Sequence, residues 1–193
     1  MLHEQSSSSD AVGAQLSRGG SINQGLRGGG SFHVECRDAE GNLKWAAEKH
    51  NLVVNVGLKD MNDKYFTGSG YTATWYLGLY GDGASNTPAA TDTAASHVGW
   101  TEVTPYSNAT RPVATFAAAT TADPSVITNS AAPAVFNVNA TETVGGAFLI
   151  SDDTKGGTTG VLFSAADFDA PGDRNVANGD TITVTYTFSL DAA

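Results

Sequence analysis

Residues 181–190 alternate strictly between apolar and hydroxyl side chains, and no other feature of the sequence constrains the fold as much. The polar positions are all Thr or Ser, and the apolar ones are Ile182, Val184, Tyr186, Phe188 and Leu190. A period of two residues over this length predicts a β-strand with one face against a core and one polar face. The turn sequence Asn-Gly-Asp at 178–180 predicts where that strand begins.

Shorter stretches with strand-like patterns recur along the chain, separated by turn residues. A hairpin is predicted where residues 32–37 are followed by a turn at 38–42 and a return strand at 43–46. Further strand candidates are residues 74–80, 113–117, 134–140, 143–150 and 160–164. Strands at this spacing, with few helices, predict an all-β fold, a β-sandwich of jelly-roll or immunoglobulin-like topology. Periodicity alone does not choose between the two topologies.

One short helix is predicted, over residues 56–66. Leu58, Met61 and Tyr65 recur there at helical spacing. Asn55 stands where a capping side chain is expected, and the glycines at 68 and 70 predict the end of the helix.

The composition limits the partners of the chain. It carries 10 basic and 20 acidic residues, for a net charge of −10. Phosphate contacts supply most nucleic-acid affinity, so this acidity argues against a nucleic-acid partner. No apolar run approaches the ~20 residues of a membrane span, and residues 1–5 show no basic and apolar leader. We therefore expect neither a membrane segment nor a secretory signal.

The lone cysteine, Cys36, excludes an intrachain disulfide and any site built from several cysteines. Alternation places it on the same face as Phe32 and Val34. We expect a buried thiol that acts as a small apolar side chain.

Residues 1–31 differ in composition from the rest and predict an extended N-terminal arm, with the sandwich domain at 32–193. A serine run at 6–9 and glycines at 19–20 and 28–30 favour flexibility, because ordering them costs backbone entropy with little apolar burial in return. Two interpretations stay open: a disordered terminus, or an arm that becomes ordered against a partner. The residues that would anchor it on a partner are Val12, Leu16, Arg18, Ile22, Leu26 and Arg27.

No constellation in the sequence supports catalysis. The four histidines are scattered, no Gly-x-Ser-x-Gly elbow is present, and no two of Glu35, Glu102 and Glu142 are paired by the pattern. The glycines at 156–160 lack the Lys-Ser/Thr ending of a phosphate-binding loop, so we read a turn there. We expect no catalytic residues and no cofactor.

The best candidate metal site is the acidic loop that contains Asp167, Asp169 and Asp173, whose carboxylates could hold Ca²⁺. It does not match an EF-hand, since no Glu closes the loop, and solvated loop carboxylates are the preferred interpretation. No metal is therefore predicted.

The tryptophans raise a separate question, because aromatic rings can line a sugar-binding face. Trp75 and Tyr76 lie in an apolar run and are predicted to be core residues. Trp100 is harder to place, and we treat it as a candidate surface or interface residue.

Six longer strings form a combination that can be compared with known families. They are Gly-Asn-Leu-Lys-Trp at 41–45, His-Asn-Leu-Val-Val-Asn-Val-Gly-Leu at 50–58, Thr-Trp-Tyr-Leu-Gly-Leu at 74–79, Ser-His-Val-Gly-Trp-Thr-Glu at 96–102, Tyr-Ser-Asn-Ala-Thr-Arg-Pro at 106–112 and Gly-Ala-Phe-Leu at 146–149. Together they resemble a family of tailed-bacteriophage virion proteins, over residues 32 to 190. Within that family the chain resembles the β-sandwich cement, or decoration, proteins that lock the outside of a mature capsid.

This resemblance implies a jelly-roll-like body and self-association on a lattice of major capsid protein. The expected partners are the major capsid protein and other copies of the chain, forming a homo-oligomer on the particle. The expected location is the virion, after synthesis in the host bacterial cytoplasm. The alternative is a tail or fibre component, such as a receptor- or carbohydrate-binding module that uses Trp100. A polysaccharide-degrading enzyme is the least favoured hypothesis.

Overall fold

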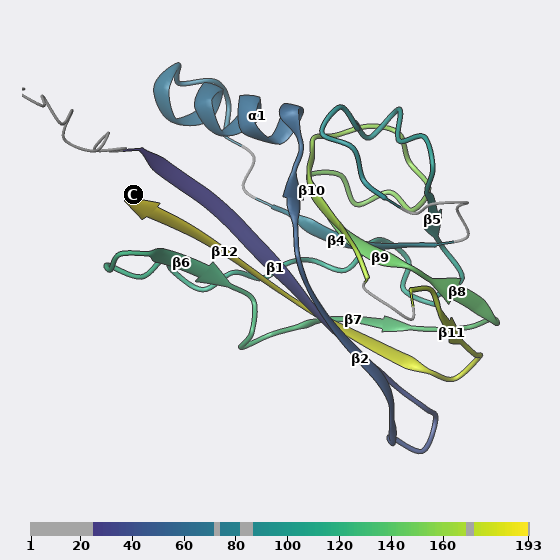
Figure 1. The fold of residues 1–193 in the computed structure, drawn as a ribbon. Coiled ribbons are helices and arrows are strands. Elements are labelled where there is room, and N and C mark those ends of the chain that lie inside the picture. Colours follow the sequence, from purple (N-terminus) through teal and green to yellow (C-terminus); the bar gives the residue numbers. More distant parts are fainter. Residues whose placement is uncertain (1–24, 72–73, 82–86, 169–171, 193) are drawn as a thin grey trace, which may run out of the picture.

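The computed structural model describes residues 25–71, 74–81, 87–168 and 172–192, and two antiparallel sheets dominate it (Figure 1). The first sheet contains β1 (Leu26–Arg37), β2 (Leu43–His50), β6 (Ser125–Thr128), β7 (Ala134–Asn137) and β12 (Thr181–Ala192). Its order is β2-β1-β12-β6, and β7 also pairs with β12. The hairpin predicted at residues 32–46 is present, as β1 and β2.

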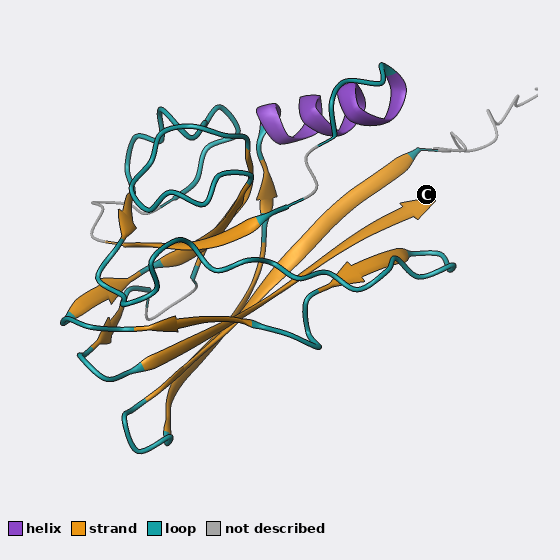
Figure 2. Cartoon of the chain, turned by 180° about the vertical axis from the view of Figure 1, so that it is seen from behind, coloured by secondary structure: helices purple, strands orange, loops and turns teal. Residues whose placement is uncertain are grey.

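The second sheet has the order β3-β10-β9-β4-β5. Its strands are β3 (Leu52–Val53), β4 (Tyr76–Gly81), β5 (Thr101–Val103), β9 (Gly146–Ile150) and β10 (Leu162–Asp167). A separate pair is formed by β8 (Glu142–Val144) and β11 (Arg174–Val176). The helix α1 (Asn55–Phe66) lies at the end of the molecule where β1 begins and β12 finishes (Figure 2). No helix among the described residues is long and apolar enough to span a membrane.

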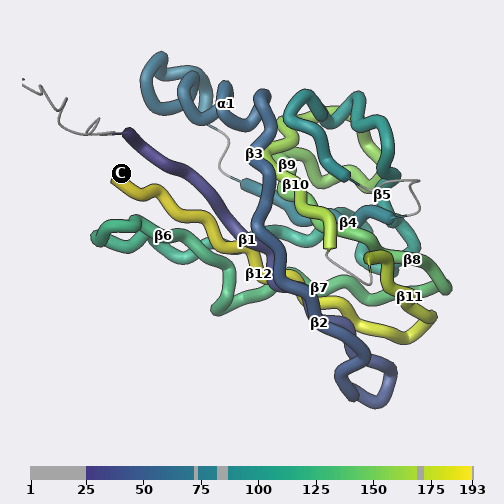
Figure 3. The backbone as a smooth tube through the Cα atoms, in the orientation of Figure 1, coloured from purple at the N-terminus to yellow at the C-terminus, as the bar shows by residue number. Residues whose placement is uncertain are grey.

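The main core lies between the two sheets. On β12, the inward residues Ile182, Val184 and Tyr186 are fully buried, as the alternation predicts. β1 lies beside β12 along its whole length, so the two end segments of the described chain form the centre of one sheet (Figure 3). Leu79 and Leu149 of the second sheet pack into the same cluster. The all-β sandwich predicted from the sequence is confirmed.

β1 begins at Leu26, six residues before the predicted start of the domain. The boundary at residue 31 is therefore wrong, and the glycines at 28–30 belong to the sheet. The physical reason lies at positions 28 and 30, which are on the same inward face of β1 as Phe32. A Cβ at Gly30 would lie 2.5 Å from the carbonyl oxygen of Thr187 and 3.0 Å from the Tyr186 hydroxyl. These glycines let the strand pass close to large rings.

Replacing Gly30 with alanine should therefore destabilise the fold by about 1–3 kcal/mol, because the extra methyl group overpacks a closed contact. Gly29 supplies the matched control, since a Cβ there meets nothing within 4 Å. For Gly29→Ala we expect a change within about 0.5 kcal/mol, slightly stabilising through the unfolded state. Urea unfolding of the two variants measures both. Equal losses would mean that the strand does not begin before Phe32.

The second sheet is buried on its outer face as well. There, two aromatic rings lie over glycines directly opposite them on the neighbouring strand: Tyr80 over Gly146, and Phe148 over Gly78. A Cβ at Gly78 would lie 2.1 Å from the Phe148 ring. A segment between β4 and β5 covers these rings and creates a second apolar cluster. Aromatic–glycine pairs of this kind pin the register of a sheet.

Two strand predictions need correction. Residues 143–150 form two strands that pair in different sheets, because the chain passes from β8 to β9 at Gly145. Residues 113–117 form no strand and make only one bridge, between Val113 and Tyr76. Their backbone hydrogen bonds are divided, since Ala114 N–H donates to Trp75 and Ala117 N–H donates to Thr128. This segment therefore connects the edges of the two sheets.

The helix is confirmed, but its predicted cap is wrong. Val54 occupies the N-cap position and makes no side-chain capping bond, while Asn55 is the first helical residue. Of the three apolar residues whose spacing predicts the helix, only Met61 packs against the core. The helix is held close to β10 at Gly57, where a Cβ would lie 2.5 Å from the Phe163 carbonyl oxygen.

Cys36 is fully buried, as predicted. Burial raises the pKa of its thiol to about 11, and the nearby Asp180 carboxylate contributes to the same shift. The thiol therefore stays protonated near neutral pH, which removes its nucleophilic form.

Candidate functional site

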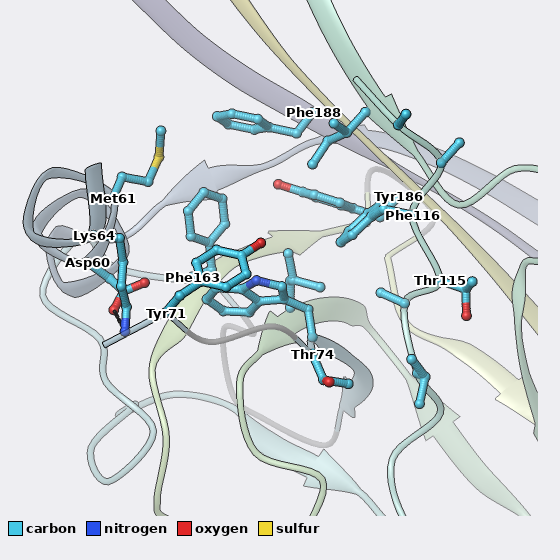
Figure 4. Close-up of a pocket in the computed structure, with 17 residues that line it drawn as sticks. Asp60, Met61, Lys64, Tyr71, Thr74, Thr115, Phe116, Phe163, Tyr186 and Phe188 are labelled. Carbon is cyan, nitrogen blue, oxygen red and sulfur yellow. Dashed lines mark ion pairs between the residues drawn. The ribbon is translucent and has the colours of Figure 1, made fainter. Parts of the chain in front are cut away.

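A pocket of about 670 Å³ opens between the sheets at the end of the molecule that carries α1 (Figure 4). One wall is α1, through Met61, Lys64 and Asp60. The opposite wall is the connecting segment at 113–118, and the floor comes from strands of both sheets. Pockets of about 300–1,000 Å³ are the size that holds drug-sized ligands, so this one has room for more than one side chain.

Aromatic rings make up most of the floor. Phe163 contacts Phe188 and Trp75 edge-on, with ring centroids 5.5 Å apart in both pairs. Phe116 lies edge-on to Tyr186 at 6.1 Å. Rings from both sheets thus face the same space. Aromatic side chains offer large apolar contact areas at low conformational cost, which suits binding of an apolar group.

The pocket lining contains two charged side chains, and these are paired with each other. Asp60 and Lys64 form an ion pair of 3.6 Å on α1, drawn as a dashed line in Figure 4. The Tyr186 hydroxyl accepts a bond of 2.8 Å from the Asn51 side-chain N–H and lies 3.2 Å from the Ser164 hydroxyl. Burial raises the pKa of Tyr186, so its hydroxyl stays neutral. The pocket is therefore suited to bind an apolar group that carries a polar atom at its edge.

Exposed apolar side chains occur at the same end of the molecule. Tyr71 lines the pocket and is 81% exposed, and Tyr65 at the end of α1 is 83% exposed. Phe66 beside it and Leu26 at the start of β1 are exposed too. We call these four residues the apolar end. Exposed apolar side chains concentrated in this way mark surfaces that contact another molecule.

The predicted partner-binding residues of the arm fall into two groups. Leu26 and Arg27 lie on β1, where both are exposed. Leu26 pairs with Ala192 at the end of β12. The other four, Val12, Leu16, Arg18 and Ile22, lie outside the described residues.

Trp100 is not a surface residue, and this prediction is wrong. Only 5% of it is exposed. Its ring packs against both Tyr80 and Phe148, and the His97 ring is stacked on it with the centroids 3.8 Å apart. Its indole N–H donates a bond of 2.9 Å to Asp92. The ring fills the second apolar cluster and cannot serve as an open sugar platform.

Two carboxylates of the acidic loop, those of Asp167 and Asp173, lie in the part of the chain that the structure describes. Asp167 ends β10 and accepts a hydrogen bond of 3.3 Å from the Thr87 hydroxyl, and Asp173 precedes β11. Asp169 lies outside the described residues. Among the residues that the structure describes, no group of three or more potential ligands could hold a metal ion.

A buried ion pair between Arg111 and Glu102 escapes the sequence analysis. Arg111 donates two bonds to the Glu102 carboxylate, of 2.8 and 2.7 Å, and further bonds to the carbonyl oxygens of Asp152 and Gly157. Glu102 also accepts from the Gly156 N–H at 2.7 Å. The pair thus ties the turn between β9 and β10 to the outer side of the second sheet. Glu102 lies in the string at 96–102 and Arg111 in the string at 106–112, two of the six strings that resemble phage virion proteins. Membership of these strings was the one sign in the sequence that the two residues matter.

Comparison with known proteins gives no match to this chain among family models, curated proteins or solved structures.

Proposed function

We propose that this chain is a structural protein of a bacteriophage particle, a decoration protein that binds and stabilises the lattice of the major capsid protein. The observation that carries the proposal is the concentration of an open aromatic pocket and four exposed apolar residues at one end of the sandwich. Exposed apolar side chains also occur singly elsewhere, as at Leu43 and Val98, but at this end they adjoin an open pocket. This end is suited to contact another protein.

The rest of the molecule fits a scaffold for that contact. β1 and β12 pair over twelve residues each, which gives the sheet a rigid centre directly behind the apolar end. Repeated on a lattice, modest contacts at each copy add up to a large stabilisation, because every further contact is intramolecular within the particle. The partner that we propose, the major capsid protein, comes from the resemblance of the sequence strings to phage virion proteins.

The test is the number of copies of this chain in purified particles, measured by quantitative mass spectrometry. The most abundant virion protein in the same digest is the internal reference. We expect a ratio to that protein near one, or a simple fraction such as about one third, as lattice symmetry requires. A count of about three to twenty-four copies per particle would overturn capsid decoration and indicate a tail, fibre or vertex component.

A further inference from the structure

The N-terminal segment of 24 residues joins the domain beside the pocket. Gly28 of β1 is in contact range of a pocket ring, since a Cβ there would lie 3.2 Å from the Phe188 ring. β1 begins at Leu26, at the same end of the sandwich as α1 (Figure 1). The 24-residue segment is therefore attached to the domain at the end that carries the pocket.

The length of the segment allows it to reach another molecule. At about 3.3 Å per residue, 24 residues extend over roughly 80 Å. A compact chain of this size has a radius of gyration of about 16 Å. Reaching the pocket of an adjacent copy is well within this length. The pocket of the same chain is within this length too, and a monomeric wild type would indicate that occupant.

The chemistry of the segment complements the pocket. Val12, Leu16 and Ile22 are single apolar residues separated by small and polar ones. The pocket offers apolar rings with a polar edge at Asp60 and Lys64. Each separate apolar side chain can therefore enter the pocket while the neighbouring polar residues remain in water.

The distribution of charge favours a contact made through the segment over one made face to face. Residues 25–193 carry a net charge of −9, whereas residues 1–24 carry −1. Two such bodies repel each other at close range, and a nearly neutral segment can cross the gap between them.

We propose that the pocket binds the N-terminal segment of a neighbouring copy, through Leu16 and Ile22, so that adjacent copies are linked by exchanged arms. The inference deepens the proposed function and rests on it for the crowding of copies on a lattice. It assigns the pocket to a neighbouring copy and leaves the exposed side chains of Leu26, Tyr65 and Phe66 for the capsid protein. The contact buries Leu16 and Ile22 against the aromatic rings of the pocket, and this burial of apolar surface supplies the binding free energy.

The test measures self-association of the full-length protein by sedimentation velocity over a range of concentrations. The arm variant is Leu16→Asp with Ile22→Asp, and its control is Ser17→Asp with Ser21→Asp, which adds the same charge at polar positions. The pocket variant is Ala118→Trp, which places a large ring at an exposed lining position. Its control is Ala119→Trp, an exposed neighbour outside the lining.

We expect the wild type and both controls to associate, and the arm and pocket variants to associate at least about tenfold more weakly. An equimolar mixture of the arm and pocket variants should regain association, because one supplies an intact arm and the other an open pocket. A monomeric wild type, variants that associate like the wild type, or a mixture that stays monomeric would each overturn arm exchange.

These outcomes are independent of the copy number in particles. A lattice-scale copy number with a monomeric wild type would leave decoration standing and reject arm exchange. Arm exchange in solution with only a few copies per particle would reject capsid decoration alone.

Discussion

Replacing Arg111 with methionine is expected to lower the free energy of unfolding by about 3–5 kcal/mol, because the change leaves a buried carboxylate without its cation. Arg111 is 2% exposed and the Glu102 side chain is 8% exposed. After the substitution, Glu102 keeps only the Gly156 N–H as a donor in this network. The carbonyl oxygens of Asp152 and Gly157 also lose their bonds to the guanidinium.

The matched control is Arg37→Met, which removes an Arg–Glu pair on the surface. Arg37 and Glu35 are 3.2 Å apart and both are partly solvated, so we expect a loss of no more than about 1 kcal/mol. Urea unfolding followed by tryptophan fluorescence measures both variants on the same scale. Similar losses for the two would mean that the Arg111 pair is solvated and does not hold the turn between β9 and β10.

A second variant separates the ion pair from simple packing. With Glu102→Leu added to Arg111→Met, the buried charge disappears along with its partner, and much of the lost stability should return. If the double variant is less stable than Arg111→Met alone, then the hydrogen bonds to the turn matter more than the unpaired charge.

Local sequence patterns predict those strands in which buried and exposed positions alternate regularly along the chain. β12 is the clearest case, since its alternation alone determines which side chains enter the core. Cys36 is predicted correctly for the same reason. The pattern needs no information from distant residues.

Contacts between distant segments explain what the sequence does not predict. The glycines at 28–30 have the composition of a flexible tail, yet they form a strand because Tyr186 and Thr187 lie directly against Gly30. The segment at 113–118 has strand propensity but divides its hydrogen bonds between two sheets. Neither fact is encoded within ten residues of the position concerned.

The pocket could not be found from sequence for a similar reason. Its lining comes from α1, from the connecting segment and from strands of both sheets, which are far apart in the chain. No local motif marks such a site, because only the packing of the two sheets brings these residues together.

Replacing Trp100 with alanine is expected to cost about 3–5 kcal/mol of stability, the loss typical of a buried large aromatic side chain. The ring contacts Tyr80 and Phe148, which are themselves pinned over glycines of the second sheet. Removal of the ring leaves a cavity. Tyr80 and Phe148 cannot move to fill it, because the register of their strands holds them over Gly146 and Gly78. Asp92 would also lose the indole N–H and keep a bond from the Ala89 N–H.

Trp100→Phe is the matched control, because it keeps an aromatic ring in the cluster and removes the N–H donor. We expect a smaller loss of about 1–3 kcal/mol, from the lost indole hydrogen bond to Asp92 and the reduced ring size. Thermal and urea unfolding of the two variants measure the difference. A glycan-binding role for Trp100 makes the opposite prediction: Trp100→Ala would keep its stability and lose binding to host polysaccharide. Because the ring is enclosed on both faces, we expect stability to change and no such binding to depend on it.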